Sequence, residues 1–191
     1  MPGPSLLIIS SSVRDGRKSH RVALHLQRFA AERTGMACDI ADLRAYDFPI
    51  FHERLKYQNA PSPAALEFAH RVQQAAGVII VTPEYNGGYP PALKNAVDLL
   101  YDEWHRKPVG ICTCSDGVFG GSQVITSLQF SLWKIRAWTV PAQLPMPKVQ
   151  DLFNEEGVPT DPEAMAKRAG PFVDELQWCI TAKAHMDAQK A

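Results

Sequence analysis

Residues 82–98 read TPEYNGGYPPALKNAVD and join an apolar run to an amphipathic helix through a polar turn. The run, residues 78–81 (VIIV), is typical of a strand that is buried on both faces of a parallel sheet. Pro83 ends that strand, because proline donates no hydrogen bond to a neighbouring strand. Residues 86–88 (NGG) favour positive φ and allow backbone amides to face a ligand. The stretch predicts a ligand-binding turn between a strand and a helix, although an ordinary connecting loop shares this local pattern.

A second polar loop, SSSVRDGRKS at residues 10–19, follows a predicted strand at residues 6–9 and precedes a helix. Hydroxyl groups, guanidinium charge and the free N–H groups of a helix N-terminus would meet there, which favours phosphate binding. The loop contains neither GxxxxGK[ST] nor GxGxxG, so a monophosphate fits better than a nucleoside triphosphate. The alternative is a solvated basic loop with a serine that caps the helix.

A third polar loop, SDGVFGG at residues 115–121, follows a predicted strand at residues 108–114. If the strands are parallel, all three loops leave the sheet at the same edge. This arrangement would place a phosphate at residues 10–19 and a ring system between residues 83–88 and 115–121.

Strand and helix patterns alternate five times, which predicts a parallel sheet with helices on both faces. We expect a three-layer α/β/α, flavodoxin-like fold with strand order 2-1-3-4-5. The fifth strand is expected at residues 137–140, closed by Pro141. From about residue 142 to 191 we expect an extended arm and a helix that Gly170 and Pro171 kink or split, all within a single domain of residues 1–191.

Composition narrows the function classes. The chain is 46% apolar and 21% charged, with a formal net charge of zero, so it lacks the basic excess of nucleic-acid-binding or electrostatically membrane-bound proteins. It has no apolar run near the roughly 18 residues of a membrane span, and its start lacks the pattern of a signal peptide. The four cysteines are dispersed, with no spacing typical of a metal site, and Cys112 and Cys114 are expected to be core residues; this favours a cytoplasmic protein.

Three segments of the chain resemble the NAD(P)H-dependent FMN reductase family of flavodoxin-like flavoproteins. They are PEYNGGYPPALKNAVD (83–98), SSVRDGRKS (11–19) and SDGVFGG (115–121). The similarity covers roughly residues 5 to 141. It implies that FMN is the cofactor and that ten residues bind it. The phosphate would be bound by Ser12, Arg14 and Ser19. The isoalloxazine or ribityl group would be contacted, largely through backbone groups, by Pro83, Glu84, Tyr85, Asn86 and Gly87, with Ser115 and Gly117 on the other side.

The loop at residues 10–19 and the helix start after it depart from the family pattern at two points. Ser11 stands where the family usually has glycine, and His20 and Arg21 stand where it often has asparagine. We expect the charge of Arg21 to compensate.

The resemblance implies an enzyme that passes hydride from NADPH to FMN N5 and on to free flavin, a quinone, an azo compound or a similar acceptor. We name no catalytic side chain, because the flavin performs the chemistry. NADPH is preferred to NADH because four cations could bind a 2′-phosphate: Arg14, Arg17, Lys18 and Arg106. The alternatives are a non-enzymatic FMN electron carrier and a flavin-free nucleotide or nucleoside enzyme with Glu84 as nucleophile.

Surplus apolar residues indicate an interface between copies of the chain, and the resemblance implies a homodimer or homotetramer. These residues are not needed for the buried faces of their helices. They are Leu99, Tyr101 and Trp104 in or after the helix that follows residue 90, and Phe130 and Trp133 in the helix that follows residue 121. From the neutral net charge we expect neither nucleic acid nor membrane as a partner.

Overall fold

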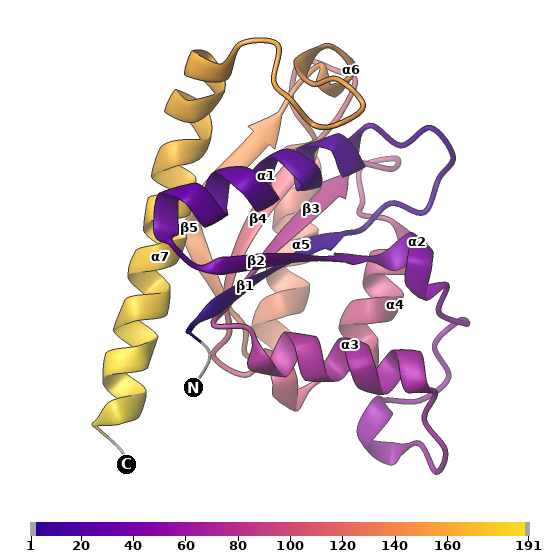
Figure 1. Ribbon diagram of the computed structural model, residues 1–191. Helices are drawn as coiled ribbons and strands as arrows, with labels where there is room; N and C mark the ends of the chain where they lie inside the picture. The colour runs from indigo at the N-terminus through magenta and orange to yellow at the C-terminus, as the bar shows by residue number, and fades with distance from the viewer. Residues whose placement is uncertain (1–2, 190–191) are drawn as a thin grey trace.

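The computed structural model describes residues 3–189. Its strands form one parallel sheet in the order β2-β1-β3-β4-β5 (Figure 1), so the expected flavodoxin-like order is confirmed. The strands are β1 (Ser5–Ser10), β2 (Ala37–Asp42), β3 (Gly77–Pro83), β4 (Pro108–Cys114) and β5 (Trp138–Met146). The helices are α1 (Ser19–Thr34), α2 (Leu43–Tyr46), α3 (Pro63–Gln74), α4 (Pro91–Leu99), α5 (Gln123–Lys134), α6 (Val149–Leu152) and α7 (Pro162–Ala188), with short 3-10 helices η1 (Leu55–Tyr57) and η2 (Asp102–Trp104).

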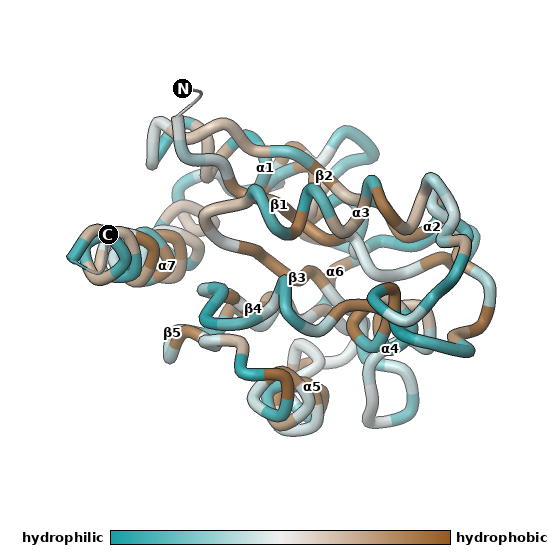
Figure 2. Tube along the Cα trace, turned by 90° about the horizontal axis from the view of Figure 1, so that it is seen from below, coloured by the Kyte–Doolittle hydropathy of each residue, from teal (hydrophilic) through white to brown (hydrophobic). Residues whose placement is uncertain are grey.

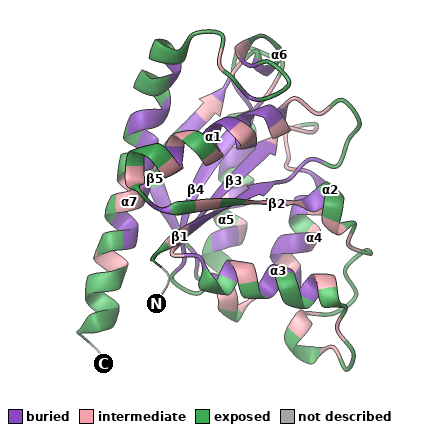
Figure 3. Ribbon diagram, in the orientation of Figure 1, coloured by how far each residue is buried: buried purple, intermediate pink, exposed green. Residues whose placement is uncertain are grey.

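Helices cover both faces of the sheet. Successive side chains of a strand point to opposite faces, so Leu6 and Ile8 pack on the side of α1 and α7, whereas Leu7 and Ile9 pack on the side of α3, α4 and α5. In Figure 2, α7 lies on one side of the sheet and α4 and α5 lie on the other. The inner strands are buried, and the edge strands β2 and β5 are partly exposed (Figure 3). This double coverage explains why the inner strands are continuous apolar runs.

The strand register brings the ends of the strands to one edge. Ser10 at the end of β1 pairs with Asp42 and Val81, and Cys114 at the end of β4 pairs with Pro83 and Met146. The loops after β1, β3, β4 and β5 therefore leave the sheet side by side, as the sequence predicts for the first three.

The fifth strand is longer than expected. The prediction that it spans residues 137–140 and closes at Pro141 is wrong, because β5 continues to Met146. Its pairing with β4 shifts register between Val109 and Ile111, so the segment around Pro141 bulges out of the ladder. Proline is tolerated at a bulge on an edge strand, since it has no ladder hydrogen bond to donate there.

Helix α7 is not split. Gly170 and Pro171 lie inside one continuous helix of 27 residues. Buried residues on both sides of Pro171, Ala169 and Phe172 among them, pack against the sheet and hold the helix together. None of the helices between residues 3 and 189 combines the length and the apolar composition that a membrane crossing needs. The four cysteines are free thiols.

The segment that joins β5 to α7, residues 147–160, folds back over α1, and we call it the strap. Arg21 donates a hydrogen bond of 3.0 Å to the carbonyl of Phe153 and pairs with Glu155. Arg28 donates one of 2.7 Å to the carbonyl of Glu156. The expected extended arm is thus partly β5 and partly a strap with fixed contacts to α1.

His25 of α1 anchors the strap through its ring. The ring stacks on Phe29 at 5.5 Å and lies 5.2 Å from the ring of Phe153, and the residue is buried. Burial, together with the positive charge of Arg28, lowers the pKa of His25 to about 4. The folded protein therefore keeps this imidazole neutral well below the pH at which an unfolded chain protonates it.

This difference predicts an acid-sensitive fold. Between pH 6.5 and 4 the unfolded state binds a proton at His25 and the folded state does not, so stability falls as the pH falls through that window. We expect the free energy of unfolding to fall between pH 7 and pH 4 in both proteins, and the fall in the H25Q variant to be smaller than in the wild type by about 3 kcal/mol. Urea unfolding at several pH values measures the difference. A variant of an exposed histidine, H70Q, should keep the wild-type dependence, and equal slopes in H25Q and wild type would contradict the prediction.

Close packing of α7 on the sheet requires glycine at position 110. A Cβ atom there would lie 2.6 Å from Cζ of Phe172, whose side chain is only 2% exposed. We expect G110A to destabilise the protein by about 1–3 kcal/mol, measured by urea unfolding. G170A is the matched control, because the methyl group that it adds to α7 would lie 3.4 Å from the flexible Arg33 side chain, and it should be neutral or slightly stabilising. Equal stability of G110A and wild type would show that the contact is not tight.

Candidate functional site

A cleft of about 410 Å³ opens at the carboxyl edge of the sheet, within the size range of small-molecule sites. It lies where the loops after β1, β3, β4 and β5 meet. Its wall is formed by Ser12, Arg14, Asp15, Gly16, Arg17, Lys18, Ser19, Pro83, Glu84, Tyr85, Cys114, Ser115, Asp116, Val149 and Gln150. Seven of the ten residues that the sequence indicates are in this wall, and Asn86, Gly87 and Gly117 lie in the same loops outside it.

The loop of residues 10–19, which we call the phosphate loop, forms one end of the cleft. Ser19 begins α1, and its Oγ is buried without a hydrogen-bond partner among the described residues. A buried hydroxyl without a partner is costly, so an added acceptor such as a phosphate oxygen would be favourable there. The first turn of α1 contains no acidic residue, and its free N–H groups add to the attraction for an anion. Ser12 and Arg14 line the same end.

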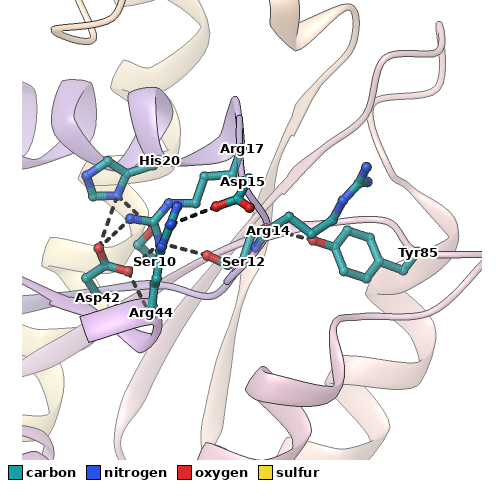
Figure 4. Close-up of polar contacts among 9 residues, drawn as sticks. All are labelled: Ser10, Ser12, Arg14, Asp15, Arg17, His20, Asp42, Arg44 and Tyr85. Carbon is teal, nitrogen blue, oxygen red and sulfur yellow. Dashed lines mark hydrogen bonds and ion pairs between the residues drawn. The ribbon is translucent and has the colours of Figure 1, made fainter. Parts of the chain in front are cut away.

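Arg17 is engaged with the protein itself. Its guanidinium donates two hydrogen bonds of 2.5 Å to the carboxylate of Asp42, at the end of β2, and one of 2.7 Å to the carbonyl of Ser12 (Figure 4). Burial alone would raise the pKa of Asp42, but hydrogen bonds from Arg17 and from the backbone N–H of Arg44 outweigh it and lower that pKa. Asp42 is therefore a carboxylate that fixes the phosphate loop to β2.

His20 and Arg21, which stand where the family often has asparagine, point in different directions. Arg21 points to the strap and binds Phe153 and Glu155, so the expectation that its charge supports the phosphate loop is wrong. His20 Nδ1 lies 3.0 Å from Ser10 Oγ and 4.0 Å from the Asp42 carboxylate. Burial, together with the charge of Arg17, lowers the pKa of His20.

The turn after β3 is a tight two-residue turn. The Tyr85 amide donates to the Gly88 carbonyl at 2.8 Å, and the Gly88 amide donates back at 3.0 Å. Asn86 and Gly87 between them have φ of 52° and 80°, the pattern of a type I′ turn, for which Asn-Gly is the favoured pair. The turn is thus formed by its own hydrogen bonds.

Fewer amides of this turn are available to a ligand than the sequence suggests. Besides Tyr85 and Gly88, Glu84 also uses its amide, in a 3.0 Å bond to the Cys114 carbonyl that ties the turn to β4. Within residues 3–189, the amides of Asn86 and Gly87 have no acceptor. These two are the donors that the turn can offer.

Tyr85 joins the turn to the phosphate loop. Its hydroxyl lies 2.7 Å from Ser12 Oγ, and the Arg14 guanidinium lies 5.5 Å from its ring centre (Figure 4). Tyr89, the other aromatic candidate, turns away from the cleft, because its hydroxyl bonds to Ser131 of α5 at 2.8 Å. Tyr85 is therefore the aromatic residue of the site.

The opposite wall combines the loop after β4 with the start of the strap. Val149 and Gln150 line the cleft, and the Val149 amide donates to the Ser115 carbonyl at 3.1 Å. Ser115 Oγ donates to the carbonyl of Gly117 at 3.2 Å. Sequence reasoning missed Val149 and Gln150, because no motif in the proline-rich segment indicates that it returns to the sheet edge.

The cations expected to bind a 2′-phosphate do not gather at one place. Arg106 precedes β4 and lies at the amino edge of the sheet, opposite the cleft, and Arg17 is paired with Asp42. Arg14 and Lys18 line the cleft. The preference for NADPH stays a prediction that depends on these two residues.

The site is built for positioning rather than for acid–base chemistry. No histidine lines the cleft, and within the described range the Glu84 side chain has no hydrogen-bond or ion-pair partner that would activate it as a nucleophile. Residues 3–189 also contain no cluster of three or more His, Cys, Asp or Glu that could hold a metal ion. A ligand with a phosphate at one end and a planar ring at the other fits the donors and walls present.

Comparison with known proteins identifies the family to which this chain is similar. The model of the NADPH-dependent FMN reductase family matches residues 4–151. An NAD(P)H-dependent FMN reductase of Saccharomyces cerevisiae is 35% identical over 64% of this chain and 70% of its own length. One of Schizosaccharomyces pombe is 32% identical over 76% of each chain. A quinone reductase of Escherichia coli is 36% identical over 62% of this chain and 63% of its own length.

A solved structure extends the similarity to almost the whole chain. The flavoenzyme NAD(P)H:(acceptor) oxidoreductase FerB from Paracoccus denitrificans superposes with a TM-score of 0.76 and 26% identity, over 94% of this chain and 98% of that one. The similarity thus includes the strap and α7, beyond the segment that the family model matches.

Proposed function

This chain belongs to the NADPH-dependent FMN reductase family and is a flavin oxidoreductase, and we propose that its cleft holds FMN with the phosphate in the phosphate loop. The observation that supports this placement best is the buried, unpaired Ser19 hydroxyl at the N-terminus of α1, beside Arg14 and Ser12. A phosphate there would accept hydrogen bonds that the protein does not satisfy itself.

The protein's part in the reaction is to bind and orient. FMN, when bound, supplies the two-electron chemistry between NAD(P)H and the acceptor. Ser12, Arg14 and Ser19 would hold the phosphate, and Pro83, Tyr85 and the free amides of the turn would border the rest of the cofactor. On the other side, Ser115 and Asp116 and the strap residues Val149 and Gln150 would border the cofactor.

The acceptor class we propose is a quinone or another small oxidised organic molecule. Its support is the 36% identity to a quinone reductase and the structural similarity to an NAD(P)H:(acceptor) oxidoreductase. The lining of the cleft includes no histidine, which suits acceptors that take electrons directly from a flavin.

Absorbance spectroscopy tests the proposal directly. We expect protein mixed with FMN and desalted to retain the flavin bands, and anaerobic NADPH to bleach them until a quinone restores them. Loss of FMN on desalting, with free FMN still supporting NADPH oxidation, would make the flavin a substrate. Slow reduction by NADPH would favour an electron carrier. Absence of both binding and oxidation would exclude a flavin enzyme.

We further propose that the chain forms a homo-oligomer through the outer face of α5. Phe130 is 60% exposed and Trp133 is 57% exposed on that face. The other residues expected there do not contribute, because Leu99 and Trp104 are buried in the core and Tyr101 is half-buried beneath Arg54 and Lys56. Two large exposed aromatic side chains on one helix support an interface with a second copy.

A charge on that face should disrupt the assembly. We expect F130E to lower the mass measured by light scattering at micromolar concentration, because a carboxylate buried at an interface without a partner is costly. L66E is the control, since Leu66 is 51% exposed on α3 and lies outside the proposed interface. A monomeric wild-type protein would contradict the proposal.

A further inference from the structure

We propose that Asp42 is a positioning residue for the FMN phosphate, which acts through Arg17 on the phosphate loop without touching the cofactor. The inference deepens the function proposed above and depends on it. It identifies what keeps a short, highly charged loop in a shape that can bind an anion before the anion arrives.

A chain of contacts runs from the edge strand to the turn after β3. Both oxygens of Asp42 accept from Arg17 at 2.5 Å, and the same guanidinium donates to the Ser12 carbonyl at 2.7 Å. Ser12 Oγ then lies 2.7 Å from the Tyr85 hydroxyl. Figure 4 shows these groups converging from β2, the phosphate loop and the turn. Ser12, an expected phosphate ligand, is thus held from two sides.

The Arg17–Asp42 pair has the properties of a fixed support. Its side chains are only 12% and 23% exposed, and its bonds are bidentate, which constrains angle as well as distance. The other ion pair that holds the loop, Arg44–Asp15, has a single bond of 2.7 Å and side chains that are 49% and 95% exposed. Exposed pairs of that kind contribute little. Of the two ion pairs, Arg17–Asp42 is therefore the firmer attachment; it fixes the side-chain end of the loop to β2, while the Ser11 amide bonds to the Val81 carbonyl of β3 at 3.1 Å.

The charge of Asp42 gives the proposal a sharp test. If Asp42 affected FMN only through its charge, it would repel the phosphate, and its removal would tighten binding. If Asp42 positions the loop, its removal releases Arg17 and the Ser12 carbonyl, and binding weakens. The two possibilities predict opposite changes in the Kd for FMN. Neither predicts a change in the Kd for riboflavin, because riboflavin has no phosphate.

The experiment titrates wild type, D42N and R17K with FMN and with riboflavin, following flavin fluorescence. We expect D42N and R17K each to raise the Kd for FMN about tenfold or more, the scale of a lost charge-assisted hydrogen bond. The Kd for riboflavin should stay within about twofold of wild type, since the ring contacts remain. R17K keeps the positive charge but loses the planar fork, so its loss of affinity would show that geometry matters rather than charge.

D174N is the matched control. Asp174 forms another bidentate pair, with Arg33 at 2.5 and 2.7 Å, at the far end of α1, and D174N should bind FMN as wild type does. Thermal unfolding followed by circular dichroism checks that each variant folds. If D42N does not fold, the Kd values of R17K for FMN and riboflavin decide the test. FMN binding by D42N that equals or exceeds wild type, or a parallel loss of riboflavin, overturns the role of Asp42. A wild-type protein that binds neither flavin overturns instead the proposed function.

Discussion

All five strands run in the same direction, and the hydrogen bonds between neighbouring strands hold their carboxyl ends at one edge. Both faces of the inner strands are occupied by helices, so polar groups are accommodated where the strands end. Segments as distant in sequence as residues 12, 84, 115 and 150 consequently surround one cleft. The direction of the sheet determines where a ligand binds, and the loops determine which ligand it is.

Much of this arrangement is predictable from the sequence because its causes are local. The buried strands are apolar runs bounded by turn residues, and the expected fourth strand, residues 108–114, coincides with β4. The Asn-Gly pair at residues 86–87 encodes its own turn through positive φ. Once the strands are recognised as parallel, the common edge of the loops follows, and with it the location of the phosphate loop, the turn and the loop after β4.

What the sequence does not reveal depends on contacts between distant segments. Pro141 reads as a strand end, and only the bulged pairing with β4 shows why β5 continues past it. Arg17, Arg21 and Arg106 look alike in the sequence, yet one binds Asp42, one binds the strap and one lies at the opposite edge of the sheet. Trp104 looks like a surface aromatic residue and is completely buried. In each case the partner is chosen by tertiary structure, on which local periodicity gives no information.

The place of β1 in the sheet also shapes how the chain can fold. β1 is synthesised before β2 and β3 but lies between them, so the edge that pairs with β3 stays unpaired until residues 77–83 have left the ribosome. Such non-local pairing slows folding and leaves an apolar strand edge open in the nascent chain. Because only β3 covers this edge, the core of the sheet can close no earlier than the synthesis of β3, residues 77–83.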